Sequence, residues 1–431
     1  MDRVFRTDAY ADILLHEAYQ KRSLTPADRA LATELTYGTL RWLGRLDWIL
    51  ERTYRGKLNR MPGLVRRVIE IGLYQILFLT RIPSYAAVDE AVRAAKESGG
   101  ESWGRVANAV LRAAIRDPER TALLPPETDP VLRIAIQESH PLWLVRKWIE
   151  QYGEEKTRSL CVANNALPAF GVRVNPLKAD KAAVRASLDA AGCRPSDSKW
   201  HDDFFVLERM GDALTSRAFR DGWFTVQDES AGFAVRLLDP RPGEVILDMA
   251  AAPGGKATGL AERSGDRQPV VAVDRYVHRA RQIVQNTVRL GIRSVFPVVA
   301  DGRTVNTKPV DKVLLDVPCS GFGIVRRHPE IKWRRTADDV VRLAPLQGEM
   351  LAAAAQSLKT GGVLVYSTCT PLVEENTGIV FDFLRRQPDF AVEPADRFLS
   401  PAVVTGGGWI ETWPDLHGMD ASFAIRLRKR G

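Results

Sequence analysis

Residues 248–259 read D-M-A-A-A-P-G-G-K-A-T-G and directly follow the apolar segment 245–247. A glycine-rich turn between a strand and a helix lets backbone N–H groups approach a bound ligand closely. The turn does not match G-x-G-x-x-G. It is not a P-loop either, because Ala257 follows Lys256 and Ala250 stands where the first glycine is required. The stretch therefore predicts a strand, a turn and a helix that bind a ligand through neither of these motifs.

Strands and helices alternate around this turn, which is typical of a doubly wound α/β sheet with right-handed crossovers. The expected strands are Val245–Asp248, Val270–Asp274, Val295–Val299, Lys312–Asp316 and Gly362–Ser367. The expected helices are Lys256–Glu262, Val277–Leu290, Asp338–Leu358 and Glu375–Arg386.

Acidic residues stand at or just after the ends of successive strands. Asp274 lies twenty residues after Gly254, where an acid can accept hydrogen bonds from ribose hydroxyls. Asp301 follows the third strand, and Asp316 ends the fourth. Each alone is more often the cap of a helix or turn than a ligand, but these strand ends share the edge at which open α/β sheets bind ligands. Together with the glycine-rich turn, the acids predict a site for a nucleoside-bearing cofactor.

Two of the four cysteines stand at the same expected edge. Cys319, in D-V-P-C-S-G, follows the fourth strand, and Cys369, in S-T-C-T, follows the fifth. A cysteine is usually a small buried hydrophobe, and we assign no other role to Cys161 and Cys193. A pair of thiols without nearby histidines makes a poor metal site, so we expect no metal.

A thiol at this edge can activate a pyrimidine ring for methylation. Carbon-5 of a pyrimidine is a weak nucleophile, but a thiolate adding to carbon-6 gives it carbanion character, so that it can attack an electrophilic methyl. A base then removes the carbon-5 proton, and the thiol is eliminated. A free thiol has a pKa of about 8.5, so the site must lower that pKa or supply a base. Asp316 can hydrogen-bond the amino edge of a cytosine. The spacing leaves open which cysteine is the nucleophile.

The rest of the chain predicts two further domains. Residues 1–117 repeat apolar positions at three- and four-residue spacing, which predicts an all-helical domain with Thr25 as an N-cap and Pro26 as a first helical residue. Residues 121–130 hold three prolines and predict a linker. Expected elements of a small α+β unit are the helices Leu142–Ala163 and Asp180–Ala191 and the strands Phe170–Val174 and Phe204–Leu207. The expected domains are 1–125, 126–222 and 223–431.

The composition is that of a globular protein with a modest positive charge. The 61 Lys and Arg outnumber 53 Asp and Glu, and 45% of the residues are hydrophobic, which excludes global disorder. The excess concentrates in the runs 41–67, 326–335 and 426–430. One such run is usually a solvated face, but three, one with an interleaved Trp333, favour phosphate contacts. The apolar run Ile71–Leu79 is too short to span a bilayer, and the charged N-terminus is unlike a signal peptide. We expect a soluble, cytoplasmic protein.

The motifs resemble, in chain order, those of the Sun/Fmu-type RNA cytosine carbon-5 methyltransferases: D-M-A-A-A-P-G-G-K, A-V-D, A-D-G-R, L-L-D-V-P-C-S-G and Y-S-T-C-T. R-A-L-A-T-E-L-T-Y-G-T-L-R at 29–41 and R-V-A-N-A-V-L-R at 105–112 resemble a NusB-like helical RNA-binding domain, and R-V-N-P-L-K at 173–178 resembles an RRM-like linker unit. The resemblance implies an all-α NusB-like domain, a small α+β RRM-like unit and a Rossmann-like class I methyltransferase domain. Mild departures from the family pattern are Ala250 for a common cysteine and Val317 for a common alanine. Residues 420–423 read D-A-S-F in place of D-G-F-F, which leaves an RNA contact there in doubt.

The resemblance also implies the cofactor and the site residues. It implies S-adenosylmethionine as methyl donor, with Asp274 on the ribose and Asp301 beside the adenine. It implies Cys369 as the nucleophile, Cys319 as the residue that assists product release or proton removal, and Asp316 as a third catalytic residue. The full expected cofactor set is Ala250, Ala251, Ala252, Pro253, Gly254, Gly255, Lys256, Asp274, Arg279, Asp301 and Asp316.

We therefore expect methylation of carbon-5 of a cytosine in 16S ribosomal RNA through a covalent cysteine–cytosine intermediate. The expected partner is 16S rRNA, naked or in a small-subunit precursor, and the chain is expected to be a monomer without a membrane partner. A transfer RNA enzyme with the same chemistry is one alternative. A non-catalytic RNA-binding assembly factor is another, and the intact Cys319, Cys369, Asp316 and Lys256 argue against it.

Overall fold

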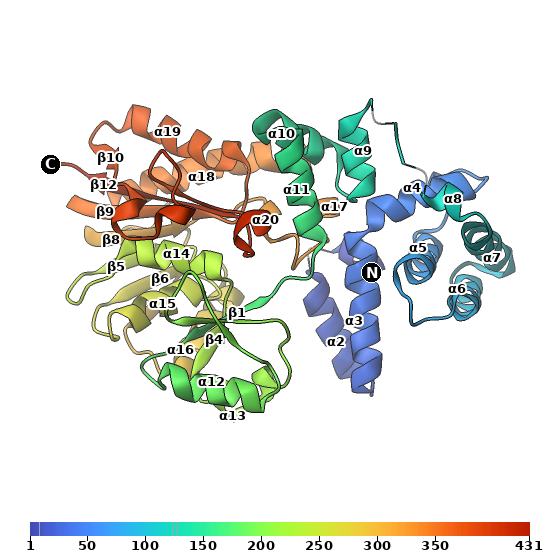
Figure 1. The fold of residues 1–431 in the computed structure, drawn as a ribbon. Helices are drawn as coiled ribbons and strands as arrows, with labels where there is room; N and C mark the ends of the chain where they lie inside the picture. The colour runs from blue at the N-terminus through green and yellow to red at the C-terminus, as the bar shows by residue number, and fades with distance from the viewer. Residues whose placement is uncertain (8, 123, 127) are drawn as a thin grey trace. The chain divides into compact units, whose positions relative to one another are not determined.

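The computed structural model describes residues 1–7, 9–122, 124–126 and 128–431, which form two compact units (Figure 1). The helical unit comprises Met1–Ala166 together with Val325–Thr336. The sheet unit comprises Leu167–Ile324 and Ala337–Gly431. No helix in the described part of the chain is long and apolar enough to cross a membrane. The domain boundaries expected from the sequence stay a prediction.

The helical unit is built on amphipathic helices that bury one apolar face. Leu46, Ile69, Leu73 and Leu111 are fully buried in its main core, which therefore joins α4, α5 and α7. The helices are α1 (Asp2–Arg6), α2 (Ala11–Lys21), α3 (Pro26–Arg41), α4 (Leu43–Thr53), α5 (Gly63–Phe78), α6 (Ser84–Gly99), α7 (Glu101–Arg116), α8 (Pro118–Ala122), α9 (Pro130–Gln137), α10 (Leu142–Tyr152) and α11 (Glu154–Asn165).

The expected start of α3 is confirmed. The Thr25 hydroxyl accepts the Asp28 N–H at 3.2 Å, and the Asp28 carboxylate accepts the Thr25 N–H, so the two residues form a capping box before Pro26. The expected linker at 121–130 overlaps the end of α8, and positions 123 and 127 lie outside the described residues.

The single helix expected over Leu142–Ala163 is wrong. Gly153 has φ +79°, a left-handed conformation that ends α10 and lets the chain change direction before α11 begins at Glu154. The apolar periodicity runs through both helices and hid the break.

The chain returns to the helical unit at Val325–Thr336, which contains the short helix α17 (Ile331–Arg334). Lys332 is 1% exposed, and its Nζ donates to the carbonyl oxygens of Arg41 and Ser139, both at 2.8 Å. Arg326 is also buried. The interpretation of run 326–335 as a phosphate-binding face is therefore wrong for Lys332 and Arg326, because buried side chains are not available to a nucleic acid backbone.

The sheet unit contains two sheets. The smaller is antiparallel, in the order β2-β3-β1-β4, and the larger has eight strands in the order β10-β12-β9-β8-β5-β6-β7, with β11 paired to β12. The strands are β1 (Phe170–Val174), β2 (Ser196–Asp197), β3 (Phe204–Leu207), β4 (Phe224–Val226), β5 (Ile246–Met249), β6 (Val270–Asp274), β7 (Val295–Val299), β8 (Val310–Asp316), β9 (Leu358–Thr368), β10 (Phe390–Val392), β11 (Ile410–Thr412) and β12 (Ser422–Lys429).

Helices cover both faces of the large sheet, as the expected doubly wound fold requires. One buried core joins the sheet to α14 (Glu229–Leu238), α15 (Gly255–Arg263) and α16 (Val277–Leu290), and a second joins it to α18 (Ala337–Gln356) and α19 (Thr377–Arg386) (Figure 1). The small sheet packs on α12 (Lys181–Ala190) and α13 (Arg217–Arg220).

Strands β5, β6, β7, β8 and β9 run parallel, so their carboxyl ends meet at one edge. The expected helix Glu375–Arg386 begins later than predicted. A short 3-10 turn, Val373–Glu375, comes first, and α19 starts only after Asn376.

Candidate active site

A cavity of about 200 Å³ opens at the carboxyl edge of the parallel strands. Four of the expected cofactor residues line it: Ala250, Asp274, Arg279 and Asp301. The sequence did not single out its other walls, which include Tyr276, Pro318, Leu346 and Met350. Leu346 and Met350 stand four residues apart on α18, and this helical spacing is the only sequence signal that relates them.

The glycine-rich turn contains two residues with positive φ, a glycine that adopts it freely and an alanine that is strained by it. Gly254 has φ +101°, and Ala250 has φ +90° although it carries a side chain. The N–H groups of Ala250 and Ala251 both donate to the Val273 carbonyl, which holds the turn against β6. α15 then begins at Gly255, and no side chain among the described residues caps its N-terminus. The first N–H groups of α15 are therefore open to an anionic ligand.

Asp274 is 2% exposed and is held in place at the end of β6. Its Oδ1 accepts the Tyr276 N–H at 3.0 Å. Arg279 lies 3.6 Å from its Oδ2 and donates to the Ala252 carbonyl, so this arginine links the acid to the glycine-rich turn. The carboxylate is thus oriented before any ligand binds.

Asp301 lies across the same cavity. Arg303 donates to its two oxygens from Nε and Nη2, and these hydrogen bonds, with the Arg303 N–H, lower the pKa of Asp301 to about 2. Asp301 is therefore ionised and able to accept hydrogen bonds at neutral pH.

Lys256 and Asp316 do not line the cavity but contact each other. Lys256 Nζ lies 2.7 Å from Asp316 Oδ2, and the Ser367 hydroxyl donates to Asp316 Oδ1 at 2.7 Å. Burial lowers the pKa of Lys256, but Asp316, with smaller contributions from Cys369 and Asp248, raises it, and the net shift is upward, so the lysine stays charged. Ala251, Ala252, Pro253, Gly254 and Gly255 also lie outside the cavity lining.

Asp248, at the end of β5, is fully buried, and neither carboxyl oxygen has a hydrogen-bond partner among the described residues. Burial, and then the charge of Asp316, raise the pKa of Asp248 to about 7. A buried carboxyl without a donor is costly, so this position suits a ligand that brings a cation or a donor.

Cys319 and Cys369 lie side by side after β8 and β9, as the adjacent strand order predicts. Their Sγ atoms are 3.2 Å apart, and the Cys369 N–H donates to Cys319 Sγ at 3.4 Å. Both are half-buried, whereas Cys161 and Cys193 are fully buried. Among the described residues, no group of three or more His, Cys, Asp or Glu is arranged to hold a metal ion.

The two thiols are not equivalent. The hydrogen bond with Cys369, burial and the nearby Glu375 hold the pKa of Cys319 well above its usual range. Cys319 therefore keeps its proton and can donate it to the Cys369 sulfur.

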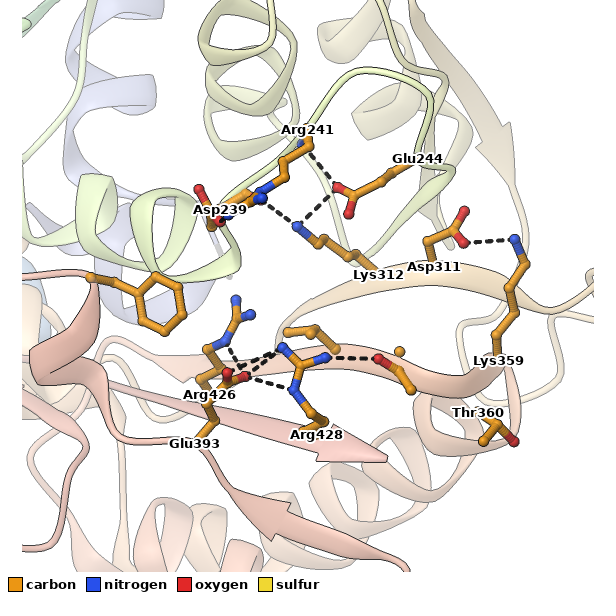
Figure 2. A pocket seen from close by; sticks show the side chains of 14 residues that line it. Asp239, Arg241, Glu244, Asp311, Lys312, Lys359, Thr360, Glu393, Arg426 and Arg428 are labelled. Atoms are coloured by element: carbon orange, nitrogen blue, oxygen red, sulfur yellow. Dashed lines mark hydrogen bonds and ion pairs between the residues drawn. The ribbon is translucent and has the colours of Figure 1, made fainter. Parts of the chain in front are cut away.

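A second cavity, of about 440 Å³, lies at the opposite edge, where β8 begins (Figure 2). Its charges are paired with one another: Lys312 with Glu244, Lys359 with Asp311, and Arg426 and Arg428 with Glu393. Arg426 is 3% exposed. The interpretation of run 426–430 as a phosphate-binding face is therefore wrong for Arg426, which completes the fold of the sheet unit.

Comparison with known proteins extends the resemblance over the whole chain. A family model described as 16S rRNA methyltransferase RsmB/F matches residues 235–428, a NusB family model matches 2–116, and a model of the ferredoxin-like domain of RsmF/B-like methyltransferases matches 140–213. The chain is 35% identical to the probable ribosomal RNA small subunit methyltransferase B of Synechocystis, over 98% of this chain and 96% of that protein. It is 37% identical to ribosomal RNA small subunit methyltransferase B of Escherichia coli K12, over 86% and 85%.

Solved structures of other proteins have a similar fold. The crystal structure of PH0851 has a TM-score of 0.82 at 26% identity and covers 96% of this chain and 93% of that one. A methyltransferase homologue from Pyrococcus horikoshii has a TM-score of 0.62 at 26% identity, over 71% of this chain and 100% of that one.

The sheet, the glycine-rich turn and the edge cavity define a Rossmann-like methyltransferase domain, here in one chain with a NusB-like helical domain and a ferredoxin-like unit. The family resemblance and the fold class predicted from the sequence are both confirmed. The chain belongs to the ribosomal RNA small subunit methyltransferase B family.

Proposed function

We propose that this chain methylates carbon-5 of a cytosine in 16S ribosomal RNA, with S-adenosylmethionine as the methyl donor. The observation that carries the proposal is the pair of half-buried thiols 3.2 Å apart beside the Lys256–Asp316 pair, at the sheet edge that also holds the nucleoside-sized cavity.

The residues at the edge fit the cofactor. S-adenosylmethionine supplies an electrophilic methyl on a sulfonium and carries both an ammonium and a carboxylate. The uncapped N-terminus of α15 suits the carboxylate. Asp248, buried and without a donor, suits a cationic group. Asp274 and Asp301 offer oriented acceptors to ribose and adenine.

The chemistry divides between the two cysteines. The Cys369 thiolate adds to carbon-6, forming a C–S bond, and the electron pair displaced onto carbon-5 attacks the methyl group. Removal of the carbon-5 proton then returns the pair to the ring and breaks the C–S bond, which frees Cys369. Cys319 keeps its own proton and lies within hydrogen-bond distance of the Cys369 sulfur, so it is suited to donate that proton to the Cys369 thiolate as the C–S bond breaks.

Asp316 and Lys256 act on the ring. One Asp316 oxygen binds Lys256 and the other binds Ser367, so the carboxylate is fixed in place. A fixed carboxylate can accept the cytosine amino group and stabilise charge that develops as the thiolate adds. The reacting carbon-6 must reach a sulfur, so the base is bound unpaired or flipped out of a helix.

The choice of RNA rests on the relatives and on the helical unit. The relatives are named as small-subunit rRNA enzymes and align along nearly the whole chain. In the run 41–67, Arg55, Lys57 and Arg60 remain exposed and available to phosphates.

The test compares three alanine variants on a 16S rRNA transcript with tritium-labelled S-adenosylmethionine, with bisulfite mapping of the product. Cys369→Ala is expected to abolish methyl transfer, and Cys319→Ala is expected to trap a covalent protein–RNA adduct that survives a denaturing gel. Cys193→Ala, at a buried thiol that donates to the Met210 carbonyl, serves as the control and should stay active. Full activity of Cys369→Ala, or methylation of transfer RNA in preference to 16S rRNA, would overturn the proposal.

A further inference from the structure

Two consecutive residues, Glu375 and Asn376, hydrogen-bond to the loops that carry the cysteines. Glu375 has entered the chemistry so far only through its charge, which raises the pKa of Cys319, and Asn376 has had no role. Glu375 is fully buried and Asn376 is 5% exposed. They stand between the 3-10 turn Val373–Glu375 and α19, outside both the cavity lining and the motifs that the sequence singled out. Among the described residues, no Lys or Arg pairs with the Glu375 carboxylate, so its partners are neutral donors.

Glu375 holds the chain on both sides of Cys319. Its Oε1 accepts the Ser320 N–H at 2.8 Å, and its Oε2 accepts the Ser320 hydroxyl. The same Oε1 accepts from Gln347 Nε2 at 3.0 Å, and Gln347 Nε2 also lies 3.0 Å from the Pro318 carbonyl. The residues before and after Cys319 are thus bound, directly or through Gln347, to one carboxylate.

Asn376 holds the chain on both sides of Cys369 in the same manner. Its Nδ2 donates to the Thr370 carbonyl at 2.9 Å, and its Oδ1 accepts the Thr368 hydroxyl at 2.5 Å. Among the described residues, neither side chain hydrogen-bonds to a cysteine sulfur; each binds the backbone or hydroxyl groups that flank one.

We propose that Glu375 and Asn376 are positioning residues with separate tasks: Glu375 sets the place of Cys319, and Asn376 sets the place of Cys369. This inference rests on the proposed function, in which Cys369 adds to the base and Cys319 assists release. It follows that loss of Glu375 slows release, whereas loss of Asn376 slows addition. A residue that only stabilised the fold would slow both steps together.

The variants follow from the hydrogen bonds. Glu375→Met removes all acceptors at similar volume, and Asn376→Leu does the same for its site. Glu375→Gln keeps an oxygen for the Ser320 N–H, and the Ser320 hydroxyl can turn to Thr370 Oγ1, 3.0 Å away, so this variant should rescue. Gln268→Met removes a buried hydrogen bond to the Leu260 carbonyl far along the chain from both loops and is the control for general loss of stability.

The readouts are single-turnover methyl transfer, steady-state kcat and KM, and the adduct on a denaturing gel, all with the full chain and a 16S rRNA transcript. Glu375→Met should lower kcat by about 100-fold, the usual cost of a displacement of about 1 Å at a reacting group. Its single-turnover transfer and its KM for the methyl donor should stay near wild type, and the adduct should accumulate. Asn376→Leu should slow single-turnover transfer by a similar factor and form no adduct.

The Cys319→Ala variant distinguishes a failure of the proposed function from a failure of the positioning roles. If it traps no adduct, the proposed function fails, and this inference with it. If it traps the adduct but Glu375→Met does not, or if Glu375→Met and Asn376→Leu slow the same step, the proposed function stands and the positioning roles are refuted. Should Glu375→Met fail to fold, Ser320→Ala removes only the hydroxyl arm of the Glu375 contact and must show a weaker form of the same adduct; its absence is equally a refutation.

Discussion

Replacing Arg173 with methionine should destabilise the sheet unit and weaken the cofactor site at the same time. Arg173 belongs to β1 of the small sheet, is 4% exposed, and reaches α15, the helix that begins at the glycine-rich turn. It donates to both oxygens of Glu262, at 2.7 and 3.1 Å, to the Thr258 hydroxyl at 3.0 Å and to the Gly255 carbonyl at 2.6 Å. No other cation among the described residues forms an ion pair with Glu262.

The expected loss of stability follows from the unpaired Glu262 carboxylate that Arg173→Met leaves buried. Glu262 is 5% exposed, and removal of one partner of a buried ion pair costs about 3 to 5 kcal/mol because the other charge is left uncompensated. For a unit of this size that corresponds to a fall in Tm of roughly 6 to 20 °C. The N-terminus of α15 also loses the Gly255 contact, so the affinity for S-adenosylmethionine should fall as well.

The pH dependence of this loss of stability gives a sharper test than its magnitude at one pH. Burial already raises the pKa of Glu262, and Arg173 opposes that rise. In Arg173→Met the pKa rises further above that of the unfolded chain, so the folded state binds more protons than the unfolded state. Stability is then lost as pH rises through the folded pKa. The deficit should be small near pH 5 and large near pH 8.

Thermal unfolding at pH 5 and pH 8 measures the loss of stability in Arg173→Met. The variant Glu262→Gln and the double variant Arg173→Met/Glu262→Leu are measured alongside it. The double variant, which buries no unpaired charge, should recover much of the lost stability. A deficit that is equal at pH 5 and pH 8, or a double variant no more stable than Arg173→Met, would refute the reasoning.

Three further outcomes are expected. Asp316→Asn should lower kcat by about 10² to 10³-fold and bring the pKa of Lys256 down, as methyl-transfer assays and lysine NMR would report; unchanged turnover would exclude a role for the carboxylate in catalysis. Arg303→Met should raise the pKa of Asp301 from about 2 toward 3.8, measured by carboxyl NMR, so that the stability which Asp301 contributes above pH 3.8 in the wild type, and which is lost as pH falls toward 2, largely disappears in the variant; an unshifted titration would contradict the assigned cause. Gly254→Ala, at φ +101°, should cost about 1 to 2 kcal/mol and loosen cofactor binding, whereas an unchanged Tm would show that the turn relaxes freely.

Much of the sheet unit was predictable because its signals are local. The alternation of strands and helices follows from short apolar runs, and parallel strands place their carboxyl ends at one edge whatever the side chains are. Asp274 and Asp301 therefore meet at one cavity with Ala250 of the glycine-rich turn, whereas Arg279, on α16, was expected only from the family resemblance. The capping box at Thr25 needed only four residues of sequence.

The basic runs were not predictable in the same way. A run of arginines and lysines is the same in sequence whether it faces solvent or is buried by a distant segment. Lys332 donates to the carbonyl of Ser139, which lies 193 positions away, and Arg426 pairs with Glu393, which lies just after β10. Partners at such separations leave no trace in the composition of the run, so charge alone overstated the surface that is free for RNA.

The division of labour between the cysteines shows the same limit at the active site. Strand order predicts that Cys319 and Cys369 become neighbours, but both follow a strand and both are half-buried, so the pattern treats them alike. What distinguishes Cys319 is its raised pKa, which depends on the 3.2 Å contact with Cys369, on burial and on Glu375, an acid 56 positions after Cys319 with no motif to mark it. Because the pKa of Cys319 is held high, Cys319 is poorly suited to act as a thiolate nucleophile, which supports the proposal that Cys369 adds to the base. Removing the Cys319 thiol should therefore block release and leave addition intact, which is the asymmetry that the adduct experiment measures.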